Sequence, residues 1–205
     1  TIELLRDTLG WRTFYAYNDE VLGNDSSSKS LGRSSYKEIL LTRYLKEAVF
    51  KFNNWMTDEI FEQIVKILNT KVSSDSDIQN NEKNYQYFKD GIEVDVKDEN
   101  GNYIKRRAKL FDFTHPEEND FLAVQEMKIH GDLYRRRTDI VGFVNGIPLL
   151  FVELKKQNVD VKNAYDCNYT DYLDTIPQLF HFNAFLMLSN GLEAKVGTMG
   201  SKYDF

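Results

Sequence analysis

The spacing of hydrophobic residues changes partway along the chain, and this change constrains the fold more than any other feature. From residue 36 to residue 68, apolar residues recur at intervals of three and four, as they do on one face of a helix. After Asn84 the interval falls to two, first in Ile92-Glu93-Val94-Asp95-Val96, an alternation typical of a half-buried strand. Helices, then strands, then a further helix and strand predict an α/β fold in which helices flank a central mixed β-sheet.

Helices are expected in the first part of the chain and again near its end. Ser35 can cap the longest of them, with Glu38 three residues later completing a capping box, and Thr57 can cap the next. The stretch from 72 to 83 is polar and is expected to be weakly structured. The expected helices cover residues 2–9, 36–52, 58–68, 85–91 and 160–175.

Strands dominate the second part, and one hairpin turns at Asn145-Gly146. We expect residues 1–83 to form an N-terminal helical segment that packs on a core of residues 84–205, in one structural domain that is part of a longer chain. The expected strands cover residues 92–96, 103–113, 121–130, 138–144, 147–155, 184–188 and 193–198.

The composition excludes several classes of protein. The chain has 205 residues, of which 41% are hydrophobic, and this suits a globular domain with a sizeable core. The single cysteine, Cys167, excludes a disulfide framework within the chain, and three histidines are too few and too scattered to suggest a zinc cluster. No apolar run approaches the roughly 20 residues that a membrane helix needs, so we expect no membrane partner. The net charge of −6 argues against strong stand-alone binding to duplex DNA, although basic residues cluster at 105–107, 135–137 and 155–156.

Three charged residues, Asp139, Glu153 and Lys155, form the arrangement best suited to chemistry. Side chains two apart in a strand point to the same face, so Glu153 and Lys155 project together from an otherwise apolar strand. A buried charge is costly unless it is paired or bound to a metal. Two carboxylates can bind Mg²⁺, which neutralises phosphate charge and acidifies a bound water, and a lysine can position that water or stabilise developing charge. Hydrolysis of a phosphodiester is one interpretation, and a surface ion pair on an amphipathic hairpin is the other.

The pairing of the two strands decides whether the two carboxylates can meet. A regular hairpin with a two-residue turn at Asn145-Gly146 would pair Asp139 with Val152 and would turn Glu153 away from Asp139. A three-residue loop with its glycine in the left-handed conformation would shift the pairing of the two strands by one residue. Both carboxylates would then lie on the same side of the hairpin. We therefore expect a bulged turn at Asn145-Gly146, or another bulge near Pro148.

The same residues lie in a longer run that resembles a known nuclease motif. The run from Arg137 to Leu149, continued by Glu153-Leu154-Lys155, is similar to the nuclease motif in the R subunit of type I restriction endonucleases. That subunit begins with a nuclease domain of the RecB-like branch of the PD-(D/E)xK superfamily, so the resemblance implies a restriction-endonuclease-like core. Further blocks that resemble the family follow in the right order along nearly the whole chain, within residues 32–53, 84–94, 112–121 and 176–191.

The resemblance implies a role for each of the central residues. Asp139 would be the first motif aspartate, Glu153 the second carboxylate and Lys155 the catalytic lysine. The backbone carbonyl of Leu154 would join the two carboxylates as a ligand of Mg²⁺, for which Mn²⁺ is an expected substitute. Thr138 stands where the motif usually has proline.

Auxiliary residues are expected around this centre. RecB-like members add a Gln-x-x-x-Tyr motif on the following helix, where this chain has Asn168 and Tyr172, so a shorter amide replaces the glutamine. Arg137 and Lys156 are expected to contact DNA. Glu38 is a further acidic candidate beside the metal, although the capping box explains it better.

By the resemblance, the expected function is metal-dependent endonucleolytic hydrolysis of double-stranded DNA, as the nuclease domain of a type I site-specific deoxyribonuclease in a prokaryotic cytoplasm. The expected partners are the methylation and specificity subunits and the downstream helicase-like motor domains of the same chain. ATP would act only through domains absent here, because the chain has no Gly-x-x-x-x-Gly-Lys-Ser/Thr loop. The alternatives are a catalytically weak docking module for the motor, which the altered Asn168 position favours, and a stand-alone PD-(D/E)xK repair nuclease.

Overall fold

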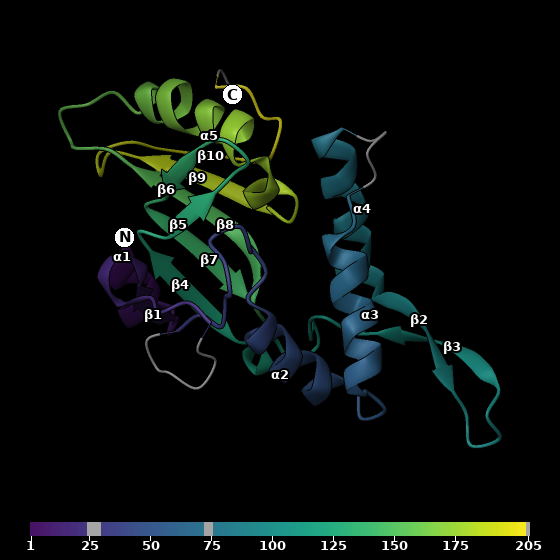
Figure 1. Ribbon diagram of the computed structural model, residues 1–205. Coiled ribbons are helices and arrows are strands. Elements are labelled where there is room, and N and C mark those ends of the chain that lie inside the picture. The colour runs from purple at the N-terminus through teal and green to yellow at the C-terminus, as the bar shows by residue number, and fades with distance from the viewer. Residues whose placement is uncertain (24–29, 72–75, 204–205) are drawn as a thin grey trace.

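A six-stranded mixed β-sheet forms the centre of the molecule in the computed structural model, which describes residues 1–23, 30–71 and 76–203 (Figure 1). In spatial order its strands are β1 (Arg12–Tyr15), β4 (Phe121–Gln125), β7 (Ile140–Val144), β8 (Ile147–Leu154), β9 (Phe185–Ser189) and β10 (Ala194–Gly197). β1 is parallel to β4 and β8 is parallel to β9, whereas the other neighbours are antiparallel. The expected α/β class with a mixed sheet is confirmed. The strand β1 is an addition, because its four residues are too few to show a periodic pattern.

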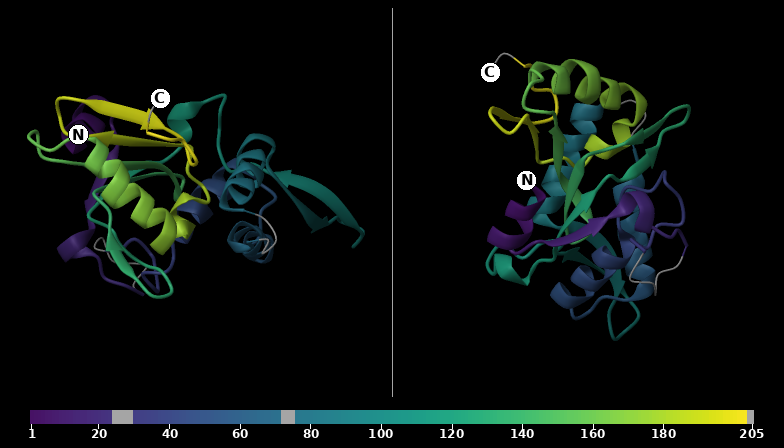
Figure 2. Two further views of the ribbon diagram at one scale, coloured as in Figure 1. Left: turned by 90° about the horizontal axis from the view of Figure 1, so that it is seen from above. Right: turned by 90° about the vertical axis from the view of Figure 1, so that its left-hand side faces the viewer.

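One face of the sheet carries the main hydrophobic core. Val141 and Phe151 of the central strands pack there with Tyr172 and Ile176 from the helical segment that crosses this face (Figures 1 and 2). A smaller cluster around Val152 covers the other face. The short helical elements are η1 (Leu4–Thr8), α1 (Ala16–Asp19), η2 (Pro116–Glu118), η3 (Ala164–Tyr169), α5 (Thr170–Thr175) and η4 (Pro177–Phe180).

A second hydrophobic cluster lies to one side of the sheet, and a β-hairpin projects from it (Figures 1 and 2). It is formed mainly by α2 (Thr42–Phe52), α3 (Asp58–Asn69), α4 (Asp77–Asp90), β2 (Ile92–Lys97) and β3 (Tyr103–Ala108). β1 belongs to the central sheet, whereas β2 and β3 belong to this cluster.

Helix α2 begins later than its apolar pattern predicted. It starts at Thr42 instead of Tyr36, and the expected capping box at Ser35 is absent. Residues 39–41 are all buried, and three consecutive buried positions cannot share one helix face, because each helical residue turns the chain by about 100°. A non-helical chain here also lets the N–H of residue 41 donate to the carbonyl of Gly146 at 2.9 Å.

The polar stretch before Asn84 is helical in its described part, which corrects the expectation of weak structure. Ser76 and Gln79 form a capping box at the start of α4, with N–H···O distances of 2.8 and 3.2 Å. The side-chain amides of Asn81 and Asn84 donate to main-chain carbonyls at and after η4. The polar residues of α4 therefore serve contacts with the sheet side of the molecule. Residues 72–75 of the same stretch lie outside the described residues.

The strand expected at residues 121–130 is bent into two. β4 ends at Gln125, Glu126 has a φ of 51°, and β5 (Lys128–His130) then pairs with β6 (Arg135–Arg137). The N–H of Glu126 donates to the carbonyl of Asp139 at 2.9 Å, so the β5–β6 hairpin continues the β4–β7 ladder beyond the central sheet.

The β7–β8 hairpin has a bulge, although not in its turn. Asn145 and Gly146 form a two-residue turn in which both have positive φ, 52° and 78°, as a type I′ turn requires. The expected three-residue loop is therefore wrong. The register shifts between Gly142 and Phe143, beside Pro148, which confirms the other expected position of the bulge.

No helix among the described residues is long and apolar enough to cross a membrane.

Candidate metal-binding and catalytic site

Asp139 and Glu153 lie opposite each other at the adjoining ends of β7 and β8. Ile140 pairs with Val152, so the next pair along the two strands is Asp139 and Glu153, and opposed residues share a face. The bulge in β8 supplies the change of parity that this arrangement requires. Asp139 Oδ2 also accepts a hydrogen bond from the N–H of Leu154 at 2.7 Å.

The carboxyl group of Glu153 is buried, and one of its two oxygens has no hydrogen-bond partner among the described residues. Glu153 is 2% exposed, and its Oε1 accepts a hydrogen bond from Lys155 Nζ at 3.0 Å. Its Oε2 has no partner in the described part of the chain. Burial, and then the negative charge of Asp139, raises the pKa of Glu153 to about 7, although Lys155 acts in the opposite direction. The pair of carboxylates is therefore short of positive charge.

The donor set suits a small, hard cation. Among the described residues, no group of three or more His, Cys, Asp and Glu side chains is placed to hold a metal ion. Mg²⁺ does not need such a group, because it is commonly held by one or two carboxylates and keeps several waters. The unpartnered Oε2 of Glu153 fits this demand. The N–H and C=O of one strand residue leave on the same side, so the carbonyl of Leu154 is directed toward the Asp139 side as well.

Lys155 is fixed through its backbone and keeps part of its side chain accessible. Its N–H donates to the carbonyl of Ser189 in β9 at 2.8 Å. Its side chain is 20% exposed, and its ammonium points at Glu153. The expectation that Glu153 and Lys155 share a face agrees with this contact.

The helical segment over the sheet brings Tyr172 and Asn168 to the same region. The Tyr172 ring packs edge-on to Phe151 with centroids 5.9 Å apart, and its hydroxyl donates to the carbonyl of Arg137 at 2.9 Å. Burial, and then the charge of Glu153, raises the pKa of Tyr172 to about 12, while a hydrogen bond with the Asn168 side chain acts in the opposite direction. Tyr172 is therefore a protonated donor, and the shorter amide of Asn168 still reaches it.

Arg137 and Lys156 are neighbours of the two carboxylates in sequence, and in the described part of the chain neither forms an ion pair with them. The guanidinium of Arg137 is 3.1 Å from the carboxylate of Glu126 and 4.7 Å from the centre of the Tyr17 ring. Lys156 is exposed at the end of β8. Both side chains remain available to a ligand that covers this end of the sheet.

Glu38, the further acidic candidate, is engaged elsewhere. Its carboxylate accepts hydrogen bonds from the hydroxyl and the N–H of Ser34. It lines a hollow of about 400 Å³ together with residues of α3 and α4. No contact in the described part of the chain joins it to Asp139 or Glu153, so it is neither a helix cap nor a member of this site.

Sequence reasoning missed Glu126, which redirects the strand opposite Asp139. A φ of 51° is uncommon outside glycine. The sequence did carry a signal, because the core-facing positions change parity at this residue. They are Leu122 and Val124 before it, and Met127 and Ile129 after it.

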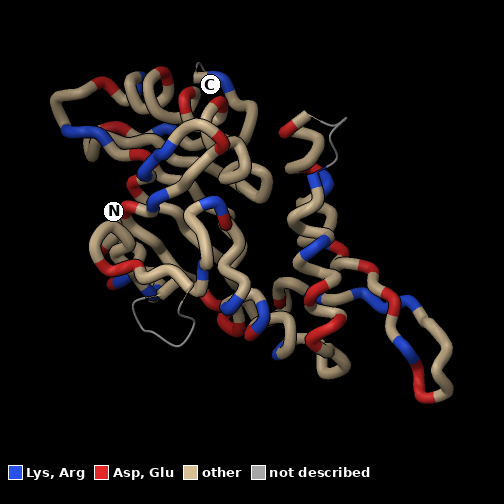
Figure 3. Tube along the Cα trace, in the orientation of Figure 1, with Lys and Arg blue, Asp and Glu red and all other residues tan. Residues whose placement is uncertain are grey.

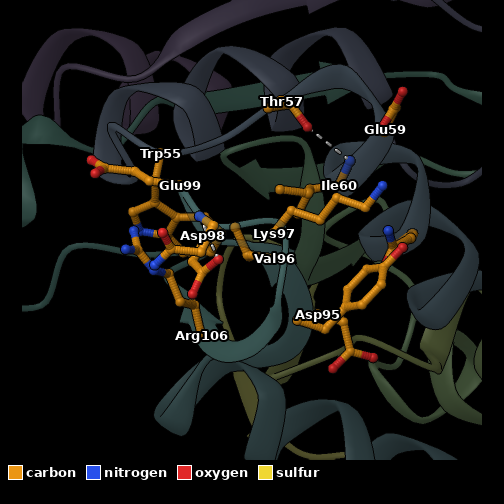
Figure 4. A pocket seen from close by; sticks show the side chains of 13 residues that line it. Trp55, Thr57, Glu59, Ile60, Asp95, Val96, Lys97, Asp98, Glu99 and Arg106 are labelled. Atoms are coloured by element: carbon orange, nitrogen blue, oxygen red, sulfur yellow. Dashed lines mark hydrogen bonds between the residues drawn. The ribbon is translucent and has the colours of Figure 1, made fainter.

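A sizeable hollow lies away from these carboxylates. It has a volume of about 620 Å³ and lies between α3 and the β2–β3 hairpin (Figure 4). The guanidinium of Arg106 lies there, 5.5 Å from the centre of the Trp55 ring. Its lining includes none of the residues at the ends of β7 and β8, so the chemistry of the groups and not the size of the hollow identifies the candidate site.

Comparison with known proteins agrees on one family. The family described as the type I restriction enzyme R protein N terminus matches residues 1–205. The chain is 29% identical over 200 residues to the HindI endonuclease subunit of a type I restriction enzyme from Haemophilus influenzae. The matched region covers 96% of this chain and 18% of that protein. It is 30% identical over 187 residues to the putative type I restriction enzyme MjaIXP endonuclease subunit from Methanocaldococcus jannaschii, which covers 89% of this chain and 18% of that protein. The chain thus spans less than a fifth of the length of these curated relatives. Because the family match covers every residue, the chain belongs to the family of type I restriction enzyme R protein N-terminal domains.

Proposed function

We propose that this chain is the nuclease domain of a type I restriction enzyme R subunit, and that it hydrolyses phosphodiester bonds of double-stranded DNA with Mg²⁺ at Asp139 and Glu153. The carboxyl group of Glu153 carries the proposal. It is buried opposite Asp139, one of its oxygens lacks a partner, and its pKa is raised to about 7. A solvated surface ion pair would have none of these properties, whereas a cation between the two carboxylates would remove the imbalance of charge.

The names of the relatives support this chemistry. The two described above are each named as an endonuclease subunit of a type I restriction enzyme. The matched part includes 96% and 89% of this chain. A carboxylate pair with an adjacent lysine would give that matched part the groups that the proposed hydrolysis needs.

Each residue has a distinct role in the proposal. When bound, Mg²⁺ would neutralise phosphate charge and lower the pKa of a bound water. Asp139, Glu153 and the Leu154 carbonyl would hold it, and Mn²⁺ would be an acceptable replacement. The ammonium of Lys155 would orient the attacking water or stabilise negative charge on the phosphate oxygens. Tyr172 would position the strand that leads to Asp139 through its hydrogen bond to a main-chain carbonyl.

The proposal includes a larger assembly. Methylation and specificity subunits would select the DNA, and downstream helicase-like motor domains of the same chain would use ATP to move it. The acidic net charge of −6 suits a domain to which other parts deliver DNA. Such an assembly would act in the cytoplasm of a prokaryote.

A docking module without cleavage is the second candidate, and the replacement of glutamine by Asn168 is the feature that favours it. Two contacts weigh against it. Lys155 points at Glu153, and the Asn168 side chain lies near enough to Tyr172 to act on its pKa.

The test is cleavage of plasmid DNA by the complete protein that carries this chain, assembled with its partner subunits in the presence of Mg²⁺ and ATP. We expect Glu153→Ala to reduce cleavage by about 100-fold or more, because it removes a group that acts on transition-state charge. Glu193→Ala, which removes an exposed carboxylate at the sheet edge, is the matched control. EDTA should stop cleavage, and Mg²⁺ or Mn²⁺ should restore it. Normal cleavage by Glu153→Ala would overturn the site.

A further inference from the structure

A basic hairpin leads directly into the candidate site. Across it, Lys128 pairs with Arg137 and His130 pairs with Arg135. Opposed residues share a face, so basic side chains stand directly across from each other, an arrangement that destabilises a sheet unless something else compensates. Lys and Arg positions recur on this hairpin in Figure 3, although the whole chain has a net charge of −6.

Acidic side chains neutralise this face only in part. Arg136 points to the other face, where it binds Asp171 of α5 at 2.5 and 2.7 Å. On the shared face, Arg137 pairs with Glu126 at 3.1 Å, and both side chains remain partly exposed. Within the described ranges, no carboxylate pairs with the exposed Arg135. Positive charge therefore remains on the face that Arg135 and Arg137 share.

An aromatic ring supports two of the cations. Lys128 Nζ lies 4.9 Å from the centre of the Tyr17 ring and donates to the Tyr17 carbonyl at 3.0 Å. The guanidinium of Arg137 lies 4.7 Å from the centre of the same ring. Such contacts orient a cation and leave its charge in place. The lowered pKa of His130, caused first by burial and then by Arg135, Arg33 and Lys37, is consistent with a positive potential here.

The backbone of the hairpin is held to the body of the protein, so its charged face is preorganised. One of the groups that hold it, the guanidinium of Arg33, is itself fully buried in an ion pair with Glu20 at 2.6 Å. Four hydrogen bonds anchor the hairpin. Three of them hold β5: the Arg33 guanidinium donates to the Lys128 carbonyl at 3.2 Å, the His130 N–H donates to the Tyr36 carbonyl at 3.0 Å, and the Gln178 amide donates to the His130 carbonyl at 3.0 Å. The fourth holds β6, where the Tyr172 hydroxyl donates to the Arg137 carbonyl at 2.9 Å.

We propose that the β5–β6 hairpin binds the DNA backbone, with Lys128, Arg135 and Arg137 contacting phosphates next to the one that is cleaved. This inference rests on the proposed function, because it describes how that site holds its substrate. Arg137 is two residues from Asp139, so their Cα atoms lie within about 7.6 Å of each other. A phosphate chain that reaches Asp139 therefore passes alongside β6. Contacts of this kind fix the position of DNA and carry no sequence information.

The test measures binding of a fluorescently labelled DNA duplex to the complete protein in EDTA, at salt concentrations from about 50 to 200 mM. The double variant Lys128→Gln/Arg135→Gln is compared with Lys97→Gln/Arg106→Gln, which removes two cations from the β2–β3 hairpin. Each lost duplex phosphate contact lowers the slope of log K against log salt by about 0.9, so we expect a decrease of about 1.8 in the first variant and none in the control. The charge-preserving variant Lys128→Arg/Arg135→Lys should retain the slope of the wild type.

Thermal unfolding separates a binding role from a structural one. Removing two cations from a face of like charges relieves repulsion, which offsets the loss of the Lys128 contacts with Tyr17, so the melting temperature should change little. A clearly lower melting temperature would indicate a structural role and would overturn the inference. An unchanged slope, an equal decrease in the control, or wild-type binding that does not depend on salt would each overturn the inference. Its failure is distinguishable from that of the proposed function, because the cleavage assay of Glu153→Ala does not depend on these slopes.

Discussion

Glu153 is the residue at which stability and the proposed chemistry oppose each other. Its carboxyl group is 2% exposed and stands opposite Asp139, with one ammonium at 3.0 Å. The raised pKa, about 7, means that the folded protein holds a proton that the unfolded chain releases at a lower pH. A neutral side chain of the same shape would fit the apolar strand better, so the carboxylate lowers stability at neutral and alkaline pH.

Glu153→Gln should therefore stabilise the protein at pH 8 when EDTA is present. An acid whose pKa rises from 4.5 to about 7 on folding contributes stability below pH 4.5 and loses it as the pH rises through 7. The expected gain in the free energy of unfolding is roughly 1–3 kcal/mol at pH 8, and it should shrink toward pH 5. Urea unfolding at both pH values measures it. An equal difference between variant and wild type at the two values would contradict this account.

At the scale of single elements, the β7–β8 turn is buried where a hairpin turn is usually exposed. Asn145 is fully buried, and its amide donates to the Leu110 carbonyl and the Asn119 side chain. A Cβ on Gly146 would lie 2.3 Å from the carbonyl oxygen of Leu41. The turn thus fixes the start of α2 against the sheet, and the chain before α2 in turn leaves no room for a side chain at Gly146.

Gly146→Ala should destabilise the protein by at least about 2 kcal/mol, because it combines strain at a φ of 78° with a main-chain clash. Gly101→Ala is the matched control, since its φ is 82° and nothing lies within 4 Å of the added Cβ. It should show only the backbone part of the cost, about 1–2 kcal/mol. Chemical denaturation of both variants gives the comparison. Equal losses would mean that the contact with α2 has no energetic weight.

The elements that the sequence predicted well are those with a strict local pattern. β2 and β9 follow from alternation or a compact apolar run, and Thr57 accepts a hydrogen bond from the Ile60 N–H as the cap of α3. β3 begins at the expected Tyr103 but ends at Ala108 instead of Phe113. β1 and the start of α2 could not be predicted, since their conformations depend on partners distant in sequence. The bulge in β8 was predictable only as one of two positions. An extra residue in the turn and an extra residue within the strand would bring Asp139 and Glu153 together equally well.

At the scale of the whole molecule, polar contacts of α4 connect the two hydrophobic clusters. The amides of Asn81 and Asn84 bind main-chain carbonyls near η4. His181 Nε2 lies 3.0 Å from Asp77 Oδ1 at the start of the same helix. These contacts explain why a helix with a weak apolar pattern forms here. They also explain why the sequence placed it poorly, because its polar residues look like solvated surface.

Protonation of His181 should lower stability as the pH decreases below about 6.5, in opposition to the contribution of Glu153 over the same range. Burial lowers the pKa of His181 below 6.5 despite the opposing effect of Asp77. The unfolded chain then binds a proton where the folded protein does not, so stability present above pH 6.5 is lost as the pH falls through the lower folded pKa. Relative to the wild type, His181→Gln should therefore gain stability in urea unfolding as the pH falls from 7 to 5. His115→Gln, at a side chain that is 63% exposed, is the control, and identical pH profiles for all three proteins would refute the assignment.

The candidate site was predictable in its residues and not in its surroundings. The pattern of Asp139, Glu153 and Lys155 came from the sequence, and so did the condition that a bulge must bring them together. The unpartnered oxygen of Glu153 and the redirection of the chain at Glu126 depend on packing. Local sequence contains the chemistry of such a site, whereas its electrostatic balance is a property of the folded chain.

The bulge beside Pro148 leaves one residue of β8, Leu149, without a partner in β7. This extra residue determines which changes in strand length the site can tolerate. Losing the codon for Leu149 would close the bulge and leave the pairing from Gly142 to Asp139 intact, so the two carboxylates would still meet. Gaining a codon in the same place offers no such compensation and would turn Glu153 away. A scan of single-codon deletions and insertions across residues 147–152, scored by DNA cleavage, should therefore be asymmetric in favour of deletions at residue 149. Equal tolerance of both kinds would contradict it. A lineage of this family could shorten the strand without losing activity, whereas a single added codon would leave it with a folded domain that no longer cuts.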